Sequence, residues 1–363
     1  MTIDTRYIQF FDGGTPPTLA ELGGKGSSLV TMTAAGMPVP PGFVVTTHQF
    51  DDFIAEAGIA DDIHQLLDGL DANNVDEVER VAAQIREEIT SKPMPLHIRE
   101  QTIAAYEQLQ SKFAEPVPVA VRSSATAEDL PDASFAGQQD TYLWINGFDE
   151  VGIHIRKCFA SLYTSRAIIY RLRNNIPNDG LSMAVVVQKM VNAKTSGVAM
   201  TIDPANGDRS KIVIDASYGV GEMVVSGEVT PDNLRLDKVT LQVIDERIGD
   251  KHAELVVDPA GSKLVQREVN EKRRAQRCLS SDEVLAVANL AKRAEKHYRV
   301  PQDVEWAIDG DLPAGENVLL LQARPETVHS AKPKASRSSS GSTPATAAFD
   351  LSSVMKFAAP RVN

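Results

Sequence analysis

Two short segments near the end of the chain constrain its fold most strongly. Residues 302–308 (QDVEWAI) alternate between polar and apolar side chains, which predicts a β-strand with one polar and one apolar face. Residues 319–325 (LLLQARP) predict a second strand. The segment between them, 309–317, is rich in Asp, Gly, Pro and Asn, so we expect a turn that joins the two strands as an antiparallel hairpin.

Four polar side chains would converge on one face of this hairpin. If the turn is symmetric, Glu305 lies opposite Gln322 and Asp303 lies opposite Arg324, because the residue numbers of the two pairs have the same sum. Two carboxylates and an amide oxygen suit Mg²⁺, which prefers oxygen ligands, and an arginine fork suits phosphate. The pattern therefore predicts a site for a nucleoside triphosphate and its metal ion. An amphipathic hairpin with a solvated charged face is the alternative.

A glycine-rich turn near the start of the chain also suits phosphate. In residues 22–29 (LGGKGSSL), the glycines allow backbone N–H groups to approach an anion, and Lys25 adds a positive charge at the start of an expected helix. The segment is not a P-loop, because Leu19 and Gly26 stand where that motif needs a glycine and a Ser or Thr. A helix-entry loop that binds nothing is the alternative.

A third segment places an arginine beside small and hydroxylic residues. Residues 117–129 (VPVAVRSSATAED) predict a strand that ends at Arg122. The polar run continues through 134–141 (SFAGQQDT), which could fold over phosphates about Gly137 while Arg122 neutralises their charge. A polar surface loop with an incidental arginine is the alternative.

The Gly-x-Gly sequence at 219–221 is a weak sign of dinucleotide binding. Val224 stands where the dinucleotide-binding fingerprint needs a third glycine or an alanine. That interpretation therefore fails.

Taken together and in this order, these segments resemble the nucleotide-binding domain of the phosphoenolpyruvate synthase and pyruvate phosphate dikinase family. The resemblance extends from about Phe10 to Val328. It implies an α+β fold of the ATP-grasp type, in which two subdomains close on ATP and Mg²⁺. The expected boundaries are 1–191 for the N-terminal subdomain, 192–328 for the C-terminal subdomain with the metal-binding hairpin, and 329–363 for a flexible tail that could dock a partner.

The resemblance also implies roles for individual residues. It assigns phosphate binding and catalysis to Lys25, Arg122 and Arg324, and metal binding to Glu305 and Gln322. Further nucleotide-binding positions are Gly137, Gln138, Gln139 and Thr141 in the loop over the phosphates, Lys189 and Glu222 on the adenine and ribose side, and Asp303.

The chemistry implied by the resemblance is that of a dikinase. ATP gives its β and γ phosphates to a histidine on a separate domain and leaves as AMP, inorganic phosphate is released, and the remaining phosphoryl group passes to an acceptor. The carrier histidine of the family follows a Gly-Gly and Thr-containing stretch. None of the seven histidines here has that context: His48, His64, His97, His154, His252, His297 and His329. We therefore expect one subunit of a split enzyme, with a partner subunit that carries the histidine and the acceptor domain.

A split arrangement resembles the phenylphosphate synthases and the cresol-phosphorylating enzymes, so a phenol or cresol is the predicted acceptor. The alternatives are a phosphoenolpyruvate synthase-type subunit acting on pyruvate and an antibiotic phosphotransferase. Outside enzymes, the alternative is a nucleotide-binding regulatory protein.

Composition is consistent with a globular catalytic subunit in the cytoplasm. The formal net charge of −12 argues against nucleic acid as the main partner. Cys158 and Cys278 are too few and too far apart in sequence to indicate a disulfide framework or a zinc site. We expect no membrane span, because no stretch approaches the roughly 20 apolar residues that a span requires.

Overall fold

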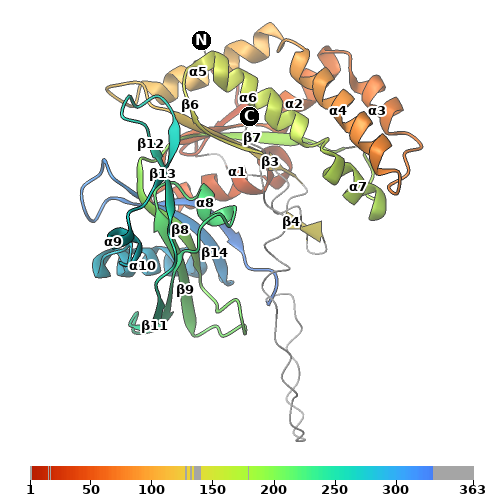
Figure 1. The fold of residues 1–363 in the computed structure, drawn as a ribbon. Helices are drawn as coiled ribbons and strands as arrows, with labels where there is room; N and C mark the ends of the chain where they lie inside the picture. The colour runs from red at the N-terminus through yellow and green to blue at the C-terminus, as the bar shows by residue number, and fades with distance from the viewer. Residues whose placement is uncertain are drawn as a thin grey trace, which may run out of the picture. The chain divides into compact units, whose positions relative to one another are not determined.

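The structure is a computed structural model that describes residues 2–126, 140–178 and 180–329, apart from 15 and 17, together with the backbone of two short strands within 129–134. Helices and strands are mixed throughout (Figure 1), as predicted. The chain divides into two compact units. The first contains Met1–Val191, Val257–Val265 and Leu319–Ala323, and the second contains Asn192–Val256, Gln266–Val318 and Arg324–Asn363. The predicted tail lies outside the described residues from position 330 onward.

The first unit is built on a five-stranded sheet. Neighbouring strands are antiparallel, and their order is β1 (Ile8–Phe10), β2 (Gly42–Val45), β7 (Met183–Lys189), β3 (Val119–Ala125) and β6 (Thr141–Ile145). Its helices are α1 (Leu19–Ala34), α2 (Thr47–Glu56), α3 (Ala60–Leu67), α4 (Val75–Ser91), α5 (Leu96–Gln110), α6 (Phe148–Ser161) and α7 (Ser165–Arg173).

The two faces of this sheet carry different helices because side chains alternate along each strand. Val185 and Val187 of β7 belong to the large core that also contains residues of α2 through α7. Ala184 and Val186, on the opposite face, pack with Leu22 of α1 in a smaller core. Helix α1 therefore covers one face of the sheet alone, and the remaining helices cover the other (Figure 1).

One prediction about this unit needs correction. The strand expected to end at Arg122 continues to Ala125, because pairing with β7 extends as far as Met183. Residues 148–173 contain two separate helices, α6 and α7. The second begins after Thr164, whose hydroxyl accepts the N–H of Ala167 and so caps a new helix start.

The second unit contains a six-stranded sheet. Its last strand, β15, is divided between the units, because the middle of the strand, Leu319–Ala323, is assigned to the first unit. The order is β11 (Val243–Arg247), β10 (Asp232–Asp237), β9 (Lys211–Tyr218), β8 (Ala193–Met200), β14 (Gln302–Asp309) and β15 (Val318–Pro325). A two-stranded sheet is formed by β12 (Ala253–Val257) and β13 (Leu264–Glu268), and the helices are α8 (Glu222–Val225), α9 (Glu271–Arg274) and α10 (Ser281–Tyr298).

The predicted terminal strands are confirmed to within one residue at each end, as β14 and β15. The alternative interpretation, a solvated charged face, is wrong for β14. Every residue of β14 is buried except Glu305, which is half-buried, because β14 is an interior strand with β8 and β15 as its neighbours. Helix α10 has Ser280 as its N-cap, which forms a capping box with Glu283.

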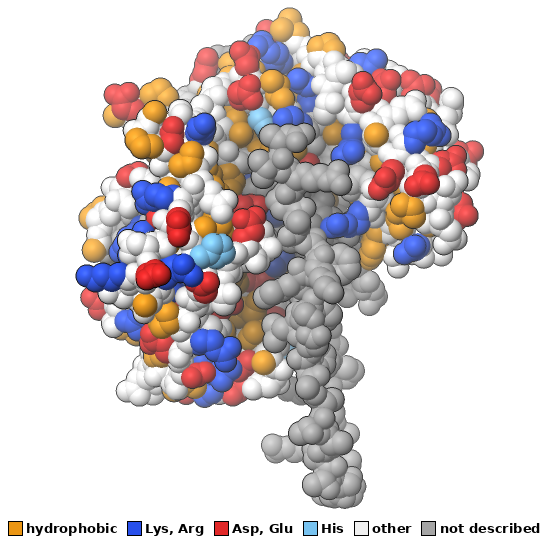
Figure 2. Space-filling model, viewed as in Figure 1, with side chains coloured by type: hydrophobic (Ala, Val, Ile, Leu, Met, Phe, Trp, Pro, Cys, Tyr) orange, Lys and Arg blue, Asp and Glu red, His pale blue; other side chains and the backbone are white. Residues whose placement is uncertain are grey.

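The described surface mixes charges of both signs. Figure 2 shows Lys and Arg side chains interspersed with Asp and Glu over the visible face of the described residues. Among the helices of the described residues, none is both long enough and apolar enough to cross a membrane.

Candidate functional site

Lys25 lies immediately after a kink in α1. The helix starts at Leu19, where the hydroxyl of Thr18 caps it by accepting the N–H of Glu21. Gly23 then leaves the helical conformation, with φ 64° and ψ −179°, and the helix resumes. Lys25 therefore lies in the first turn after the kink and is largely buried. The helix begins earlier than the sequence suggested, but the glycine-rich turn does interrupt it.

The kink brings the α1 backbone against β3. A Cβ atom at position 23 would lie 2.1 Å from the carbonyl oxygen of Ser124. The φ and ψ of Gly23 also belong to a region that is essentially restricted to glycine. Both the contact and the conformation therefore require glycine here.

Gly23→Ala is expected to destabilise the first unit. Backbone strain costs about 1–3 kcal/mol, and overpacking costs about 1–3 kcal/mol. Together these losses in the free energy of unfolding correspond to a fall in melting temperature of roughly 5–15 °C. Gly36→Ala is the matched control, because Gly36 has a similar φ of 70° but no atom within 4 Å of an added Cβ. Equal losses in the two variants, measured by thermal unfolding, would contradict the close contact.

Arg122 faces the α1 side of the sheet. Its neighbour Val121 packs into the large core on the other face, so the side chain of Arg122 projects toward the face that carries α1. The guanidinium donates to the carbonyl oxygen of Leu321 at 3.1 Å and to Oε1 of Gln322 at 2.7 Å. Arg122 is 8% exposed and Gln322 is 5% exposed, so both polar groups are held in a nearly water-free setting.

The segment that carries Gln322 has two further anchors in the first unit. The hydroxyl of Ser28 on α1 donates to the carbonyl oxygen of Ala323 at 2.6 Å, and the N–H of Leu320 donates to the carbonyl oxygen of Pro38 at 2.8 Å. The first unit therefore contains Lys25 on α1, Arg122 on β3 and Gln322 in the middle of β15. Two fixed cations and an amide on a buried surface are suited to binding an anion.

The second unit holds the carboxylate part of the candidate site. Oδ2 of Asp303 accepts a hydrogen bond from Nε of Arg324 at 2.8 Å and forms an ion pair with its Nη2, also at 2.8 Å, which agrees with the predicted opposition of these two residues. Burial raises the pKa of Asp303 above its usual range, although the charge of Arg324 acts in the opposite direction and that of Glu305 adds to the rise. Oδ1 of Asp303 is buried and has no hydrogen-bond partner among the described residues.

These carboxylates fit a magnesium ion. Asp303 and Glu305 are two residues apart on β14 and so share a face, and Oδ1 of Asp303 is a buried oxygen without a hydrogen-bond partner among the described residues. Within the described part of the chain, no three His, Cys, Asp or Glu side chains form a metal cage. Magnesium in nucleotide sites is usually held by one or two carboxylates and by the phosphates of the substrate, which this donor set allows.

The pKa of Asp303 predicts a pH dependence of stability. Because the folded-state pKa is raised, ionisation of this carboxyl destabilises the fold, and stability is lost as pH rises above about 4 and through the folded pKa. Asp303→Asn is expected to become progressively more stable relative to the wild type as pH rises from about 4 through the folded pKa of Asp303. Thermal unfolding across this range tests the prediction, and a constant difference between the two proteins would contradict it.

The predicted site residues are divided between the two units. Oε1 of Gln322 accepts a hydrogen bond from Arg122, and its role as a metal ligand stays a prediction. Lys189 ends β7 in the first unit, where Nζ donates to the carbonyl oxygen of Met190 at 3.2 Å, whereas Glu222 begins α8 in the second unit. Their roles stay predictions.

The predicted phosphate-covering loop is described only at its end. Thr141 begins β6, where it pairs with Arg122 and is exposed. Gly137, Gln138 and Gln139 lie outside the described residues.

One contributor was missed at the level of sequence. Ser124 is fully buried on the α1 face of β3, and its hydroxyl bonds to α1. The hydroxyl run after Arg122 was a signal, but it was interpreted as loop chemistry because the strand was expected to end there.

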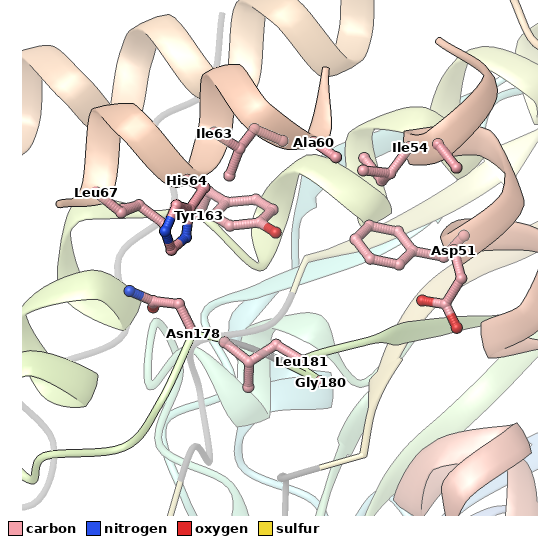
Figure 3. A pocket seen from close by; sticks show the side chains of 12 residues that line it. Asp51, Ile54, Ala60, Ile63, His64, Leu67, Tyr163, Asn178, Gly180 and Leu181 are labelled. Atoms are coloured by element: carbon pink, nitrogen blue, oxygen red, sulfur yellow. The ribbon is translucent and has the colours of Figure 1, made fainter. Parts of the chain in front are cut away.

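A separate cavity in the first unit holds none of the predicted site residues. It has a volume of about 270 Å³ and is lined by residues of α2 and α3 and by Asn178, Gly180 and Leu181 (Figure 3). Its walls are mainly apolar, with Asp51, His64 and Asn178 as polar groups. Oδ1 of Asp51 accepts the hydroxyl of Ser182 at 2.9 Å, and burial raises the pKa of Asp51. No Lys or Arg is among the described residues that line it, so it does not suit a triphosphate.

Nucleotide-binding domains use cationic side chains for phosphate and carboxylates for the metal ion. The first unit has buried cations of this kind, and the second has such carboxylates. The sequence profile for the pyruvate phosphate dikinase AMP/ATP-binding domain matches residues 19–342. The chain belongs to this family. Enzymes of the family use ATP and Mg²⁺, as the sequence analysis expected. This membership and the mixed helix and sheet architecture confirm the predicted fold class.

Several relatives of the chain are named as phosphoenolpyruvate synthases, which is consistent with this family. The probable phosphoenolpyruvate synthase of Staphylothermus marinus is 42% identical over 91% of this chain and 42% of its own length. The phosphoenolpyruvate synthases of Aeropyrum pernix and Helicobacter pylori are 41% and 39% identical, each over 91% of this chain and 43% of its own length. This chain thus spans less than half the length of these relatives.

Among solved structures, D-alanyl-alanine synthetase A of Vibrio cholerae aligns over 68% of this chain and 54% of its own, with 9% identity and a TM-score of 0.26. A similarity of this size supports no statement about the fold.

Proposed function

We propose that this chain is the nucleotide-binding part of a phosphoenolpyruvate synthase-type phosphotransferase, with ATP as phosphoryl donor and pyruvate as final acceptor. The observation that carries the proposal is the family match over residues 19–342, within which Lys25 and Arg122 are buried in the same unit. The names of the relatives support the same reaction.

The described residues have the properties that phosphoryl transfer requires. Such reactions depend mainly on positioning and on neutralisation of the phosphate charge. In the proposed enzyme, Lys25 and Arg122 bind phosphate oxygens, and Arg324 orients Asp303 through a hydrogen bond and an ion pair. Asp303 and Glu305 would hold Mg²⁺, which would add positive charge at the phosphates when bound. None of these side chains has to act as a nucleophile.

We also propose that a carrier histidine on another domain receives the phosphoryl group from ATP. The sequence predicts that a partner subunit provides it. The histidines of the described residues support this proposal, since several have local roles. Nδ1 of His154 contacts the carbonyl oxygen of Glu150 at 2.7 Å, and Nε2 of His329 contacts that of Pro204 at 2.8 Å.

The acceptor that was the first prediction, a phenol or cresol, has no support from the comparisons. The alternative prediction, pyruvate, agrees with the relatives. An antibiotic acceptor and a regulatory role without turnover have no comparable support.

The acceptor is tested by supplying the chain with a carrier-histidine protein, ATP and Mg²⁺, and then either pyruvate or p-cresol. We expect pyruvate to be consumed and phosphoenolpyruvate to form, and ³¹P NMR measures this product. Formation of an aryl phosphate with p-cresol, and no reaction with pyruvate, would contradict the proposed acceptor.

A further inference from the structure

The kink in α1 contains a side chain inserted into the helical hydrogen-bond ladder. In an uninterrupted helix, the N–H of Gly26 would donate to the carbonyl oxygen of Leu22, four residues earlier. Here the N–H of Gly26 donates to the hydroxyl of Ser124 at 3.0 Å, and that hydroxyl donates to the carbonyl oxygen of Leu22 at 2.8 Å. One hydroxyl from β3 therefore replaces the helical bond and satisfies both backbone groups. Insertion of this kind is a recognised cause of helix kinks.

We infer that Ser124 is a positioning residue for nucleotide binding: its hydroxyl fixes the kink of α1 and thereby sets the position of Lys25. The bridge encloses Lys25, which lies between the two bonded residues, Leu22 and Gly26. The inference rests on the proposed function, in which Lys25 binds phosphate.

Strand β3 then fixes both cations relative to one another. Arg122 and Ser124 are two residues apart on β3, so both face α1. Pairing with Val186 and Ala184 of β7 fixes the backbone at both positions, and Ser124 is 0% exposed. The same rigid strand therefore supplies one phosphate-binding cation directly and holds the turn that supplies the other.

A hydroxyl is the group that this position requires. It donates and accepts at once, whereas alanine does neither. In Ser124→Ala, the N–H of Gly26 and the carbonyl of Leu22 must either remain unpaired in a buried setting or bond to each other. The second outcome draws the two groups together and moves Lys25.

Ser123 offers a matched control. It is also 0% exposed and on the same strand, and its hydroxyl donates to the carbonyl oxygen of Asp140 at 3.1 Å. It therefore loses a buried hydrogen bond in Ser123→Ala without touching the kink.

The test compares the ATP dissociation constants of these variants in Mg²⁺ by calorimetry. Ser124→Ala is expected to weaken ATP binding about tenfold, the size of effect that follows from loss of one well-placed interaction. Ser123→Ala is expected to leave the ATP affinity within about twofold of the wild-type value. In a Lys25→Ala background, Ser124→Ala is expected to have no further effect, because the two residues act through one contact. Equal effects of the two serine variants, or a full tenfold effect without Lys25, would overturn the inference.

Two further measurements keep the test decisive. Ser124→Cys preserves the approximate size of the side chain but supplies a weaker hydrogen-bond donor. Its ATP affinity is expected to lie between those of the wild type and Ser124→Ala. An ATP affinity equal to that of the wild type would contradict the role of the hydroxyl. Amide hydrogen exchange at Gly26 reports on the bridge without ATP. Faster exchange is expected in Ser124→Cys and Ser124→Ala and not in Ser123→Ala, and unchanged exchange would overturn the inference. Failure of the wild-type chain to bind ATP would instead contradict the proposed function.

Discussion

Arg122→Ala is expected to weaken ATP binding at least about 100-fold. Loss of two charge-assisted hydrogen bonds to phosphate, at about 1.5–3 kcal/mol each, corresponds to a factor of this size or more. The substitution also leaves Oε1 of Gln322 and the carbonyl oxygen of Leu321 without the guanidinium that they now contact. Isothermal titration calorimetry with ATP and Mg²⁺ measures the effect.

A buried arginine elsewhere in the first unit is the control for general destabilisation. Arg171 is 1% exposed, and its Nη1 donates to the carbonyl oxygen of Leu162 at 2.8 Å. Arg171→Lys is expected to lower the melting temperature and to leave the ATP affinity unchanged. If Arg122→Ala lowers only the melting temperature, Arg122 is structural and the proposed phosphate site loses one of its two cations.

Glu305→Ala is expected to reduce Mg²⁺-dependent phosphoryl transfer at least about 100-fold while the fold stays intact. A metal ion at the reacting phosphates contributes several kcal/mol to the rate, and about 1.4 kcal/mol corresponds to a factor of ten. Glu305 is half-buried in a strand whose other residues are buried, so its carboxylate is not part of the apolar core. Turnover of ATP in the complete enzyme and the melting temperature are the two measurements.

Glu316→Ala is the matched control for Glu305. Glu316 is exposed in the turn between β14 and β15, and the same change of charge there is expected to alter neither measurement. Retained turnover in Glu305→Ala would remove this residue from the metal site.

The terminal strands could be predicted because their information is local. Alternation of polar and apolar residues in 302–308 and the turn formers after it define β14 and its end without reference to the rest of the chain. The burial of Asp303 could not be predicted in this way. It depends on the place of β14 between β8 and β15, which local periodicity does not specify.

The arrangement around Lys25 shows the same division. The glycine-rich segment indicated a break in regular structure and a phosphate-binding lysine. It did not indicate that the helix begins at Leu19, or that a hydroxyl from a strand 98 residues later completes its hydrogen bonding. That contact depends on how β3 lies against α1, a tertiary property. For the same reason, Arg122 was expected at the end of a strand although pairing with β7 carries the strand further.

The fate of the phosphates of ATP tests the central claim most directly. We would incubate the chain with ATP and Mg²⁺, with and without a carrier-histidine protein, and separate the nucleotides by chromatography. The account predicts AMP, formed only when the carrier is present. ADP as the product, or ATP binding without turnover with any carrier, would contradict a dikinase-type phosphotransferase and would indicate an ordinary kinase or a regulatory nucleotide-binding protein.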